Sequence, residues 1–340
     1  MKILIAPLNW GLGHATRCVP LIRHYLELGD EVVLAGDGDS FMLLKSTFPK
    51  LRIIDLPPLH LRYTTNAQQW GFYIRAIWTL VRFTIADHHY LRLILAREHF
   101  DLIISDNRFG LFSKDTRSVY ITHQLYPILP KRLRLFQPLA RVLHACIYKR
   151  YHEVWVPDYV DLSHNLSGAL SHGGRFDKRA KYIGPLSRFA LAFSEEIPEG
   201  CRRDTISCTC STTSTRKTSD VSGCSYATLV ILSGLEPQRT ILEREILQRF
   251  VQSPEPVLLV RGKLSEPHTA IKKGNITILP FITDDEFIAA AQKVHTIIAR
   301  SGYSTIMDLE VLGVLDKAEF YPTPGQSEQE YLLQWMSLYR

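Results

Sequence analysis

The sequence predicts an α/β protein with two parallel sheets, each covered by helices on both faces. Its first half alternates apolar strand patterns with helical patterns, as is typical of a parallel sheet. Its second half repeats a unit of strand, tight turn and helix, at 229–250 and again at 297–312. The chain has 340 residues, 46% of them hydrophobic, which is enough for two cores of ordinary domain size.

The first half begins with an apolar strand, Met1 to Pro7, followed by a glycine-rich segment and a helix that ends at Gly29. Further strands are expected at 31–35, 51–55, 101–105, 119–122, 154–158 and 181–185. In open sheets of this class the ligand lies beyond the carboxyl ends of the strands. We therefore expect one cleft to be lined by Gly11 to His14, Asp106, Asn107 and His123.

The segment Gly11-Leu12-Gly13-His14 follows the first strand and could be mistaken for a dinucleotide-binding fingerprint. The third glycine is missing, and the second strand ends in glycines before any acidic residue, which argues against hydride chemistry. His14 is a candidate general base, because an imidazole titrates near neutrality and Asp106 could orient it. A helix-capping histidine is the alternative. Arg17 lies one turn further along and could contribute charge toward a phosphate.

In the second half, the apolar run 297–299 leads into Arg300-Ser301-Gly302-Tyr303-Ser304-Thr305 and a helical pattern. The N-terminus of a helix has free N–H groups and a positive dipole end, so a turn at Gly302 suits an anion such as a diphosphate. The segment from Pro322 to Tyr331 is a rigid loop with two amides and two carboxylates, which suit sugar hydroxyls. Two alternatives stay open: Asp308 could close a capping box with Thr305, and 326–330 could be a solvated helix start.

These segments resemble the GT-B glycosyltransferases of the family 28 type, in which two Rossmann-like domains with parallel sheets face each other across a cleft. The resemblance covers Met1 to about Gly200 and Ala227 to Tyr331. It departs from the family at Asp308, where a glutamate is usual, and at Glu330, where a second amide is found. The donor-binding residues that it implies, for diphosphate, ribose, sugar and base, are Gly234, Arg239, Ile282, Arg300, Ser301, Gly302, Ser304, Thr305, Asp308, Gln326, Gln329 and Glu330.

On the acceptor side, the resemblance assigns the glycine-rich loop to the acceptor's phosphate and places the histidine at the reaction centre. Its implied catalytic residues are His14 and Asp106, and its implied acceptor-binding residues are Gly11, Gly13, Arg17, Asn107 and His123. The nucleotide sugar is a co-substrate, and neither a further cofactor nor a metal is expected. The expected activity is an inverting transfer from a UDP-sugar to a lipid-linked or membrane-associated acceptor. A 2-epimerase of the same fold and a non-catalytic binding protein are the alternatives.

Two stretches favour an anionic membrane surface as a partner. Residues 66–97 combine Trp70, Phe72, Tyr73, Trp78 and Phe83 with arginines, and 116–152 contain seven basic and no acidic residues. A buried helix and a solvated face are the alternatives. The net charge of +6 is too small to require nucleic acid as a partner. Reduced cysteines and a short first apolar run indicate a cytoplasmic protein, which could lie peripherally on the inner face of the plasma membrane.

The expected domains are 1–190 for the acceptor and 227–340 for the donor, with an irregular linker at 191–226 between them. Within the linker, 202–225 is rich in Ser, Thr and Cys and shows neither helical nor strand periodicity. A disordered insert and a local frameshift both remain open for this segment.

Overall fold

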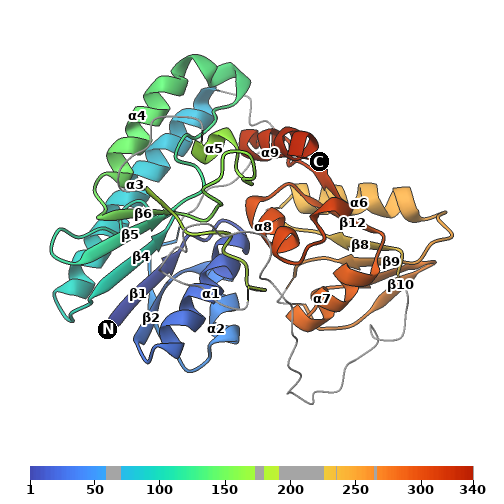
Figure 1. The fold of residues 1–340 in the computed structure, drawn as a ribbon, viewed down its shortest axis with the longest axis horizontal. Coiled ribbons are helices and arrows are strands. Elements are labelled where there is room, and N and C mark those ends of the chain that lie inside the picture. Colours follow the sequence, from blue (N-terminus) through green and yellow to red (C-terminus); the bar gives the residue numbers. More distant parts are fainter. Residues whose placement is uncertain (59–69, 173–179, 191–225, 235, 264–265, 340) are drawn as a thin grey trace.

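The computed structural model describes residues 1–58, 70–172, 180–190, 226–234, 236–263 and 266–339 (Figure 1). It contains two sheets, of seven and six strands, each in its own half of the chain. The predicted linker lies outside the described residues apart from Tyr226, as does its segment 202–225. The prediction of two parallel sheets with helices is therefore confirmed by the described residues.

All strands of the first sheet are parallel, in the order β3-β2-β1-β4-β5-β6-β7. The strands are β1 (Lys2–Pro7), β2 (Glu31–Gly36), β3 (Arg52–Asp55), β4 (Leu102–Asp106), β5 (Arg117–Ile121), β6 (Glu153–Val156) and β7 (Ala180–Tyr182). Their helices are α1 (Gly13–Glu27), α2 (Gly38–Thr47), α3 (Trp70–Leu95), η1 (Lys131–Phe136), α4 (Gln137–Tyr148) and α5 (Ala169–His172).

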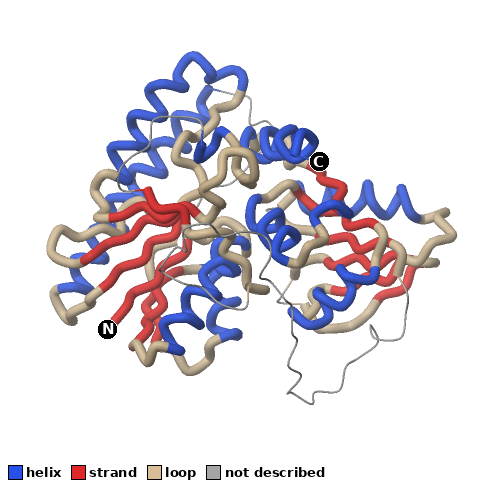
Figure 2. The backbone as a smooth tube through the Cα atoms, in the orientation of Figure 1, coloured by secondary structure: helices blue, strands red, loops and turns tan. Residues whose placement is uncertain are grey.

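Helices lie on both faces of this sheet (Figure 2). They are needed there because the apolar side chains of β1 alternate between the two faces. Ile3 and Ile5 are buried in one core cluster with Ala15 and Ile22 of α1. Leu4 and Ala6 belong to a second cluster, which includes Leu91 of α3. The register of β1 and β4 pairs Pro7 with Asp106, so the loop after β1 and the end of β4 are neighbours at one edge.

The second sheet has the order β10-β11-β9-β8-β12-β13 and is parallel except where β10 meets β11. Its strands are β8 (Thr228–Ile231), β9 (Val257–Val260), β10 (Ile271–Lys273), β11 (Ile276–Leu279), β12 (Thr296–Arg300) and β13 (Ala318–Tyr321). Its helices are α6 (Gln238–Phe250), α7 (Asp284–Lys293), α8 (Tyr303–Val311), η3 (Leu315–Lys317) and α9 (Ser327–Tyr339).

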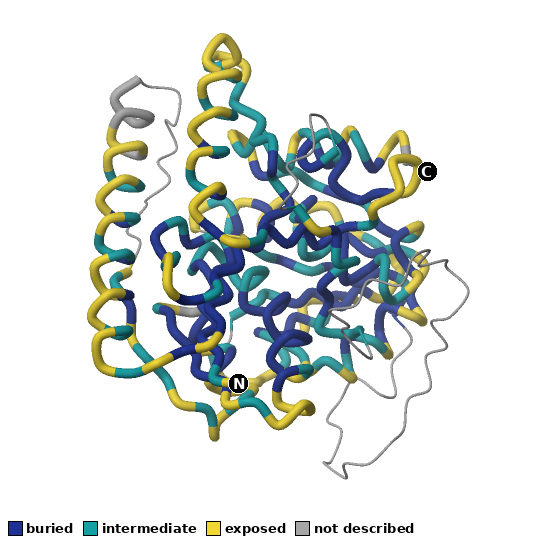
Figure 3. Tube along the Cα trace, turned by 60° about the vertical axis from the view of Figure 1, so that its left-hand side comes forward, coloured by how far each residue is buried: buried dark blue, intermediate teal, exposed yellow. Residues whose placement is uncertain are grey.

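The last helix, α9, joins the two halves, and Figure 1 shows it beside α5 of the first half. The Tyr331 hydroxyl accepts a hydrogen bond from the Ala169 amide at 2.6 Å, and Trp335 Nε1 donates to the Asn165 carbonyl at 3.0 Å. Leu166 and Leu170 are buried in the core cluster that otherwise belongs to the second sheet. Figure 3 shows buried residues along the strands and exposed residues along the outer sides of the long helices.

Replacing Gly168 with alanine tests the contact between α9 and the first half. Its φ is +52°, and an added Cβ would lie 2.7 Å from Trp335 and closer still to the Tyr331 hydroxyl. Gly313→Ala is the matched control, because Gly313 has a φ of +66° and nothing within 4 Å of its added Cβ. In urea unfolding, Gly313→Ala should cost about 1–2 kcal/mol from the backbone alone. Gly168→Ala should cost about 1–3 kcal/mol more from overpacking. Equal losses in the two variants would contradict this contact.

Candidate active site

The centre of the site is a buried ion pair between Arg17 of α1 and Asp106 at the end of β4. Arg17 Nε lies 2.5 Å from Asp106 Oδ2, and Nη2 donates to Oδ1, so the two groups meet in a bidentate arrangement. Both side chains are almost completely buried, at 1% and 0% exposure. Burial raises the pKa of Asp106, but the Arg17 guanidinium and His14 outweigh it and lower that pKa to about 2. Asp106 is therefore an anion at neutral pH.

His14 lies against this pair in the first turn of α1. Its Nδ1 is 3.1 Å from Asp106 Oδ1 and 2.8 Å from Arg17 Nη2. The Asp106 carboxylate can only accept, so its contact needs a proton on His14 Nδ1. The Arg17 guanidinium can only donate, so its contact needs a lone pair on the same atom. The two contacts therefore favour opposite tautomers of His14. Burial lowers the pKa of His14 below its ordinary value, and Arg17 lowers it too, against the opposing effect of Asp106. A neutral imidazole at pH 7 is the form that can accept a proton.

A second histidine, His123, connects the ion pair to the other half of the chain. Arg17 Nη1 lies 3.2 Å from His123 Nδ1, and His123 Nε2 lies 2.7 Å from Glu328 Oε1 at the start of α9. The His123 ring stacks on Tyr303 of α8, with centroids 4.1 Å apart and an interplanar angle of 4°. Gln124 also donates to Glu328, at 2.5 Å.

The glycine-rich turn before α1 meets the turn before α8 directly. Ser304 Oγ donates to the Gly13 carbonyl at 3.0 Å. A Cβ added to Gly13 would lie 2.6 Å from Ser304 Oγ. Gly302 is the N-cap of α8, without a side-chain cap, and a Cβ added there would meet only Thr305 Oγ1 at 4.0 Å. The uncapped N-terminus of α8 therefore lies beside the glycine-rich turn that carries His14, between the two halves.

Asp308 of α8 is buried beside the segment that leaves the first half. It accepts a hydrogen bond from the Ser187 hydroxyl at 2.6 Å, and Arg188 Nε lies 3.8 Å from its other oxygen. Burial raises the pKa of Asp308 to about 6, although Arg188 and Ser187 act against it. The alternative in which Thr305 and Asp308 form a capping box is wrong, because the N-cap of α8 is Gly302, Thr305 lies inside the helix, and no side chain caps it.

Several of the residues expected to bind the donor direct their polar groups to the protein itself. Arg300 donates to the carbonyls of Pro322 at 2.7 Å and Gln238 at 2.8 Å. Arg239 pairs with Glu236 and lies 3.6 Å from Glu243. The Arg300 guanidinium therefore holds the backbone at the start of α6 and after β13. The Arg239 guanidinium is held by the two carboxylates near the start of α6.

The loop after β13 is organised by its own side chains. Gln329 Oε1 accepts from the Thr323 amide, and the Gln329 carbonyl accepts from the buried Ser301, both at 2.8 Å. Glu330 accepts from the Gly325 amide at 3.3 Å. The Gln326 backbone N–H donates to the Thr323 carbonyl at 3.0 Å, and the Gln326 residue is half-buried.

The remaining expected residues occupy turns and edges around this centre. Asn107 has a φ of +56°, and its Oδ1 accepts from the Tyr120 hydroxyl at 2.9 Å. Gly11 and Gly234 both have positive φ, at 78° and 96°, which favours glycine there. Ile282 is half-buried and packs against the core of the second sheet.

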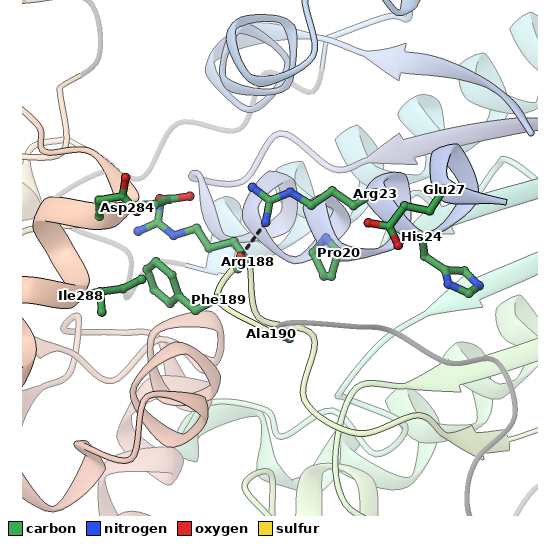
Figure 4. A pocket seen from close by; sticks show the side chains of 10 residues that line it. Pro20, Arg23, His24, Glu27, Arg188, Phe189, Ala190, Asp284 and Ile288 are labelled. Carbon is green, nitrogen blue, oxygen red and sulfur yellow. Dashed lines mark hydrogen bonds and ion pairs between the residues drawn. The ribbon is translucent and has the colours of Figure 1, made fainter. Parts of the chain in front are cut away.

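A separate cavity of about 260 Å³ lies between α1 and α7 (Figure 4). It is lined by charged side chains that include Arg23, Glu27, Arg188 and Asp284, and none of its lining residues was expected to belong to the site. Arg188 Nη1 is 3.2 Å from Asp284, and Arg188 Nε is 3.8 Å from Asp308, so this side chain contacts both the cavity lining and Asp308. Within the described residues, no group of three or more His, Cys, Asp or Glu side chains could hold a metal ion.

Sequence reasoning missed four residues of this site: Ser187, Arg188, Tyr303 and Glu328. Glu328 was visible as one of the two carboxylates of the 322–331 loop, but nothing in the sequence pairs it with His123, 205 positions away. Ser187 and Arg188 follow the strand expected at 181–185 and lie close to the expected end of the first domain at residue 190, which is the one local signal for them.

No family model matches this chain, and no curated protein does either. Among solved structures it is similar to the calicheamicin glycosyltransferase CalG4, with a TM-score of 0.59 and 14% identity, over 97% of this chain and 83% of that one. It is also similar to the spinosyn rhamnosyltransferase SpnG, with a TM-score of 0.57 and 12% identity, over 98% and 84%. For UGT2 of Phytolacca americana the TM-score is 0.56 at 12% identity, over 98% and 82%. The chain therefore has the GT-B fold, with two Rossmann-like domains.

Asp308→Asn should raise the free energy of unfolding above pH 6 by about 1–3 kcal/mol. The pKa of about 6 in the folded protein is above the ordinary 3.8, so the stabilising effect of this carboxyl is complete below pH 3.8. It is lost as the pH rises through 6, where the folded protein must hold a buried anion and asparagine avoids that cost. Urea unfolding between pH 4 and 8 measures the difference, with the exposed Asp316→Asn as control. A gain that does not depend on pH would contradict this assignment.

Proposed function

We propose that this protein is an inverting GT-B glycosyltransferase of the family 28 type. It moves a hexosyl group from a nucleotide sugar, a UDP-sugar in our proposal, to a lipid-linked or membrane-associated acceptor, without a metal. One observation supports it above the others: the His14, Asp106 and Arg17 cluster of the first domain adjoins the open amide end of α8 in the second. Two similar structures are complexes with UDP-sugars: UGT89C1 of Arabidopsis thaliana with UDP-L-rhamnose, and UGT2 of Phytolacca americana with UDP-2-fluoro-glucose.

The cluster suits general-base catalysis. With its Nδ1 proton donated to Asp106, His14 presents a free lone pair on Nε2. Nε2 takes the proton of the acceptor hydroxyl while that oxygen attacks the anomeric carbon from the face opposite the nucleotide. The bond from the anomeric carbon to the diphosphate breaks in the same step, so the configuration inverts. Arg17 keeps Asp106 ionised, and Asp106 stabilises the imidazolium that forms.

On the donor side, the diphosphate would lie at the N-terminus of α8, where Gly302 leaves the amides accessible and the helix dipole favours negative charge. The turn residues Ser301, Ser304 and Thr305, and Gly234 of the facing turn, would surround it. Arg239 would add charge. Asp308 would accept hydrogen bonds from the ribose hydroxyls. The backbone of Ile282 would contact the base. Gln326, Gln329 and Glu330 would contact the sugar.

A surface of the first domain supports peripheral attachment to an anionic membrane. Helices α3 and α4 pack on the same face of the first sheet, through clusters that contain Leu91 and Tyr148. Their outer sides and η1 expose large apolar residues: Ile77, Trp78, Val81, Ile85, Leu135, Phe136, Leu139, Val142 and Leu143. Lys131, Arg132 and Arg134 accompany them in η1, and a basic residue near an anionic surface contributes about 1 kcal/mol. No described helix has the length and apolarity to span a bilayer.

His14→Ala should lower kcat by about 10²- to 10⁴-fold while the donor Kd, measured by calorimetry, stays the same. Donors are first selected by a thermal-shift screen of nucleotide sugars. In the wild type, kcat/KM should fall as the pH falls through the His14 pKa, which burial places below 6.5. His295→Ala, at an exposed histidine, is the control. Full turnover by His14→Ala would contradict the base, and product formed without an acceptor would indicate the epimerase instead.

The membrane surface is tested by co-sedimentation with vesicles. The wild type should bind anionic vesicles at low salt and bind zwitterionic ones weakly. Leu135→Ser/Phe136→Ser should reduce the bound fraction several-fold because those side chains no longer insert. Leu338→Ser removes an equally exposed leucine, 80% against 87% for Leu135, from the other domain and should have no effect. Binding that ignores lipid charge would remove this part of the proposal.

A further inference from the structure

We propose that Glu328 is a positioning residue of the donor domain that acts on His14 of the acceptor domain through His123, Arg17 and Asp106. This inference rests on the proposed function only for its kinetic consequence. Each link is a polar contact between side chains: 2.7 Å from Glu328 to His123, 3.2 Å from His123 to Arg17, and 2.5 Å from Arg17 to Asp106. The chain of contacts ends at His14, 3.1 Å from Asp106.

The two shorter polar contacts of His123, to Arg17 and Glu328, require the same tautomer, and the third, from Gln124 Nε2 to His123 Nε2, is longer at 3.4 Å. A guanidinium has only donors, so Arg17 Nη1 needs a lone pair on His123 Nδ1. The Glu328 carboxylate only accepts, so it needs the proton on Nε2. Burial raises the pKa of Glu328, but His123, His14 and Arg17 outweigh it and lower that pKa, so Glu328 is ionised at neutral pH. Glu328 thus selects the neutral Nε2–H form that Arg17 can bind.

The surroundings of His123 restrict it further. Tyr303 stacks on the ring at 4.1 Å, and only 5% of the side chain is exposed. Gln124 donates to the second oxygen of Glu328 and fixes the carboxylate from the other side. A histidine that is stacked on Tyr303 and held at both nitrogens transmits the position of Glu328 to Arg17.

Arg17 is where this restraint matters for chemistry. Its Nη2 contacts both Asp106 and His14 Nδ1. Arg17 and Asp106 favour opposite tautomers of His14, because both contact the same ring nitrogen. A fixed Nη1 keeps Nε and Nη2 on the two oxygens of Asp106, which holds that carboxylate in reach of His14. Because Glu328 comes from the donor domain, the base is fully oriented only while the two domains are in contact.

The first test needs no turnover. Nitrogen-15 NMR of histidine-labelled protein should show His123 in the Nε2–H form, assigned by comparison with His123→Gln. In Glu328→Ala the His123 signals should move toward a mixture of tautomers, and the His14 signals should shift with them. Glu328→Gln keeps an acceptor and should retain the Nε2–H form. Glu255→Ala, which removes an exposed carboxylate of the same domain, should change neither histidine. An unchanged His123 tautomer in Glu328→Ala would overturn the proposal.

The second test is kinetic. Glu328→Ala should lower kcat by about ten- to a hundredfold, because small displacements of a catalytic group are costly, while the donor KM changes less than about twofold. Glu328→Gln should recover part of the rate. In a His123→Ala background, Glu328→Ala should add less than about a twofold loss, because groups that act as one unit are not additive. A higher donor KM with unchanged kcat, or additive losses, would overturn the relay. If no sugar is transferred but the NMR changes occur, the proposed function fails and the relay stands.

Discussion

The buried pair of Arg17 and Asp106 is the interaction on which the arrangement of the site depends. Two charges removed from water are costly unless they are paired and hydrogen-bonded, and here the guanidinium uses Nε and both Nη groups on Asp106, His14 and His123. The pair connects α1 to the end of β4, so the first helix cannot rotate without leaving a buried charge unpaired. This constraint places His14 and His123 on either side of one guanidinium.

The contact between the halves is built from single, specific polar contacts as well as from apolar packing. Three side-chain hydroxyls donate hydrogen bonds here. Ser304 donates to the Gly13 carbonyl and Ser187 to the Asp308 carboxylate. Tyr303 donates to the Pro157 carbonyl at 2.8 Å. Asp308 shows the cost of such a site, because burial makes its anion unfavourable in the folded protein. A carboxylate held against the preference of its surroundings is typical of functional positions.

Two arginines that were expected to bind the donor also support the scaffold in this structure. Arg300 and Arg239 hold backbone carbonyls and nearby glutamates around α6 and β13. The helix end at Gly302, by contrast, has no side-chain cap and little around it. The backbone N–H groups and the dipole of α8 are therefore available to an anion at this edge, whereas the two guanidinium groups are also engaged by the loops around them.

The sequence by itself determined the fold class and the position of most strands, because local apolar periodicity encodes both. The segments expected at 31–35 and 101–105 are the strands Glu31–Gly36 and Leu102–Asp106. It also indicated that the ends of β1, β4 and β5 converge, since parallel strands share a carboxyl edge. Only the tertiary structure decided which side chains pair: Arg17 contacts both oxygens of Asp106, and Glu328 contacts His123. Those contacts join residues 89 and 205 positions apart, and no local pattern specifies which side chains meet once the two sheets are in place.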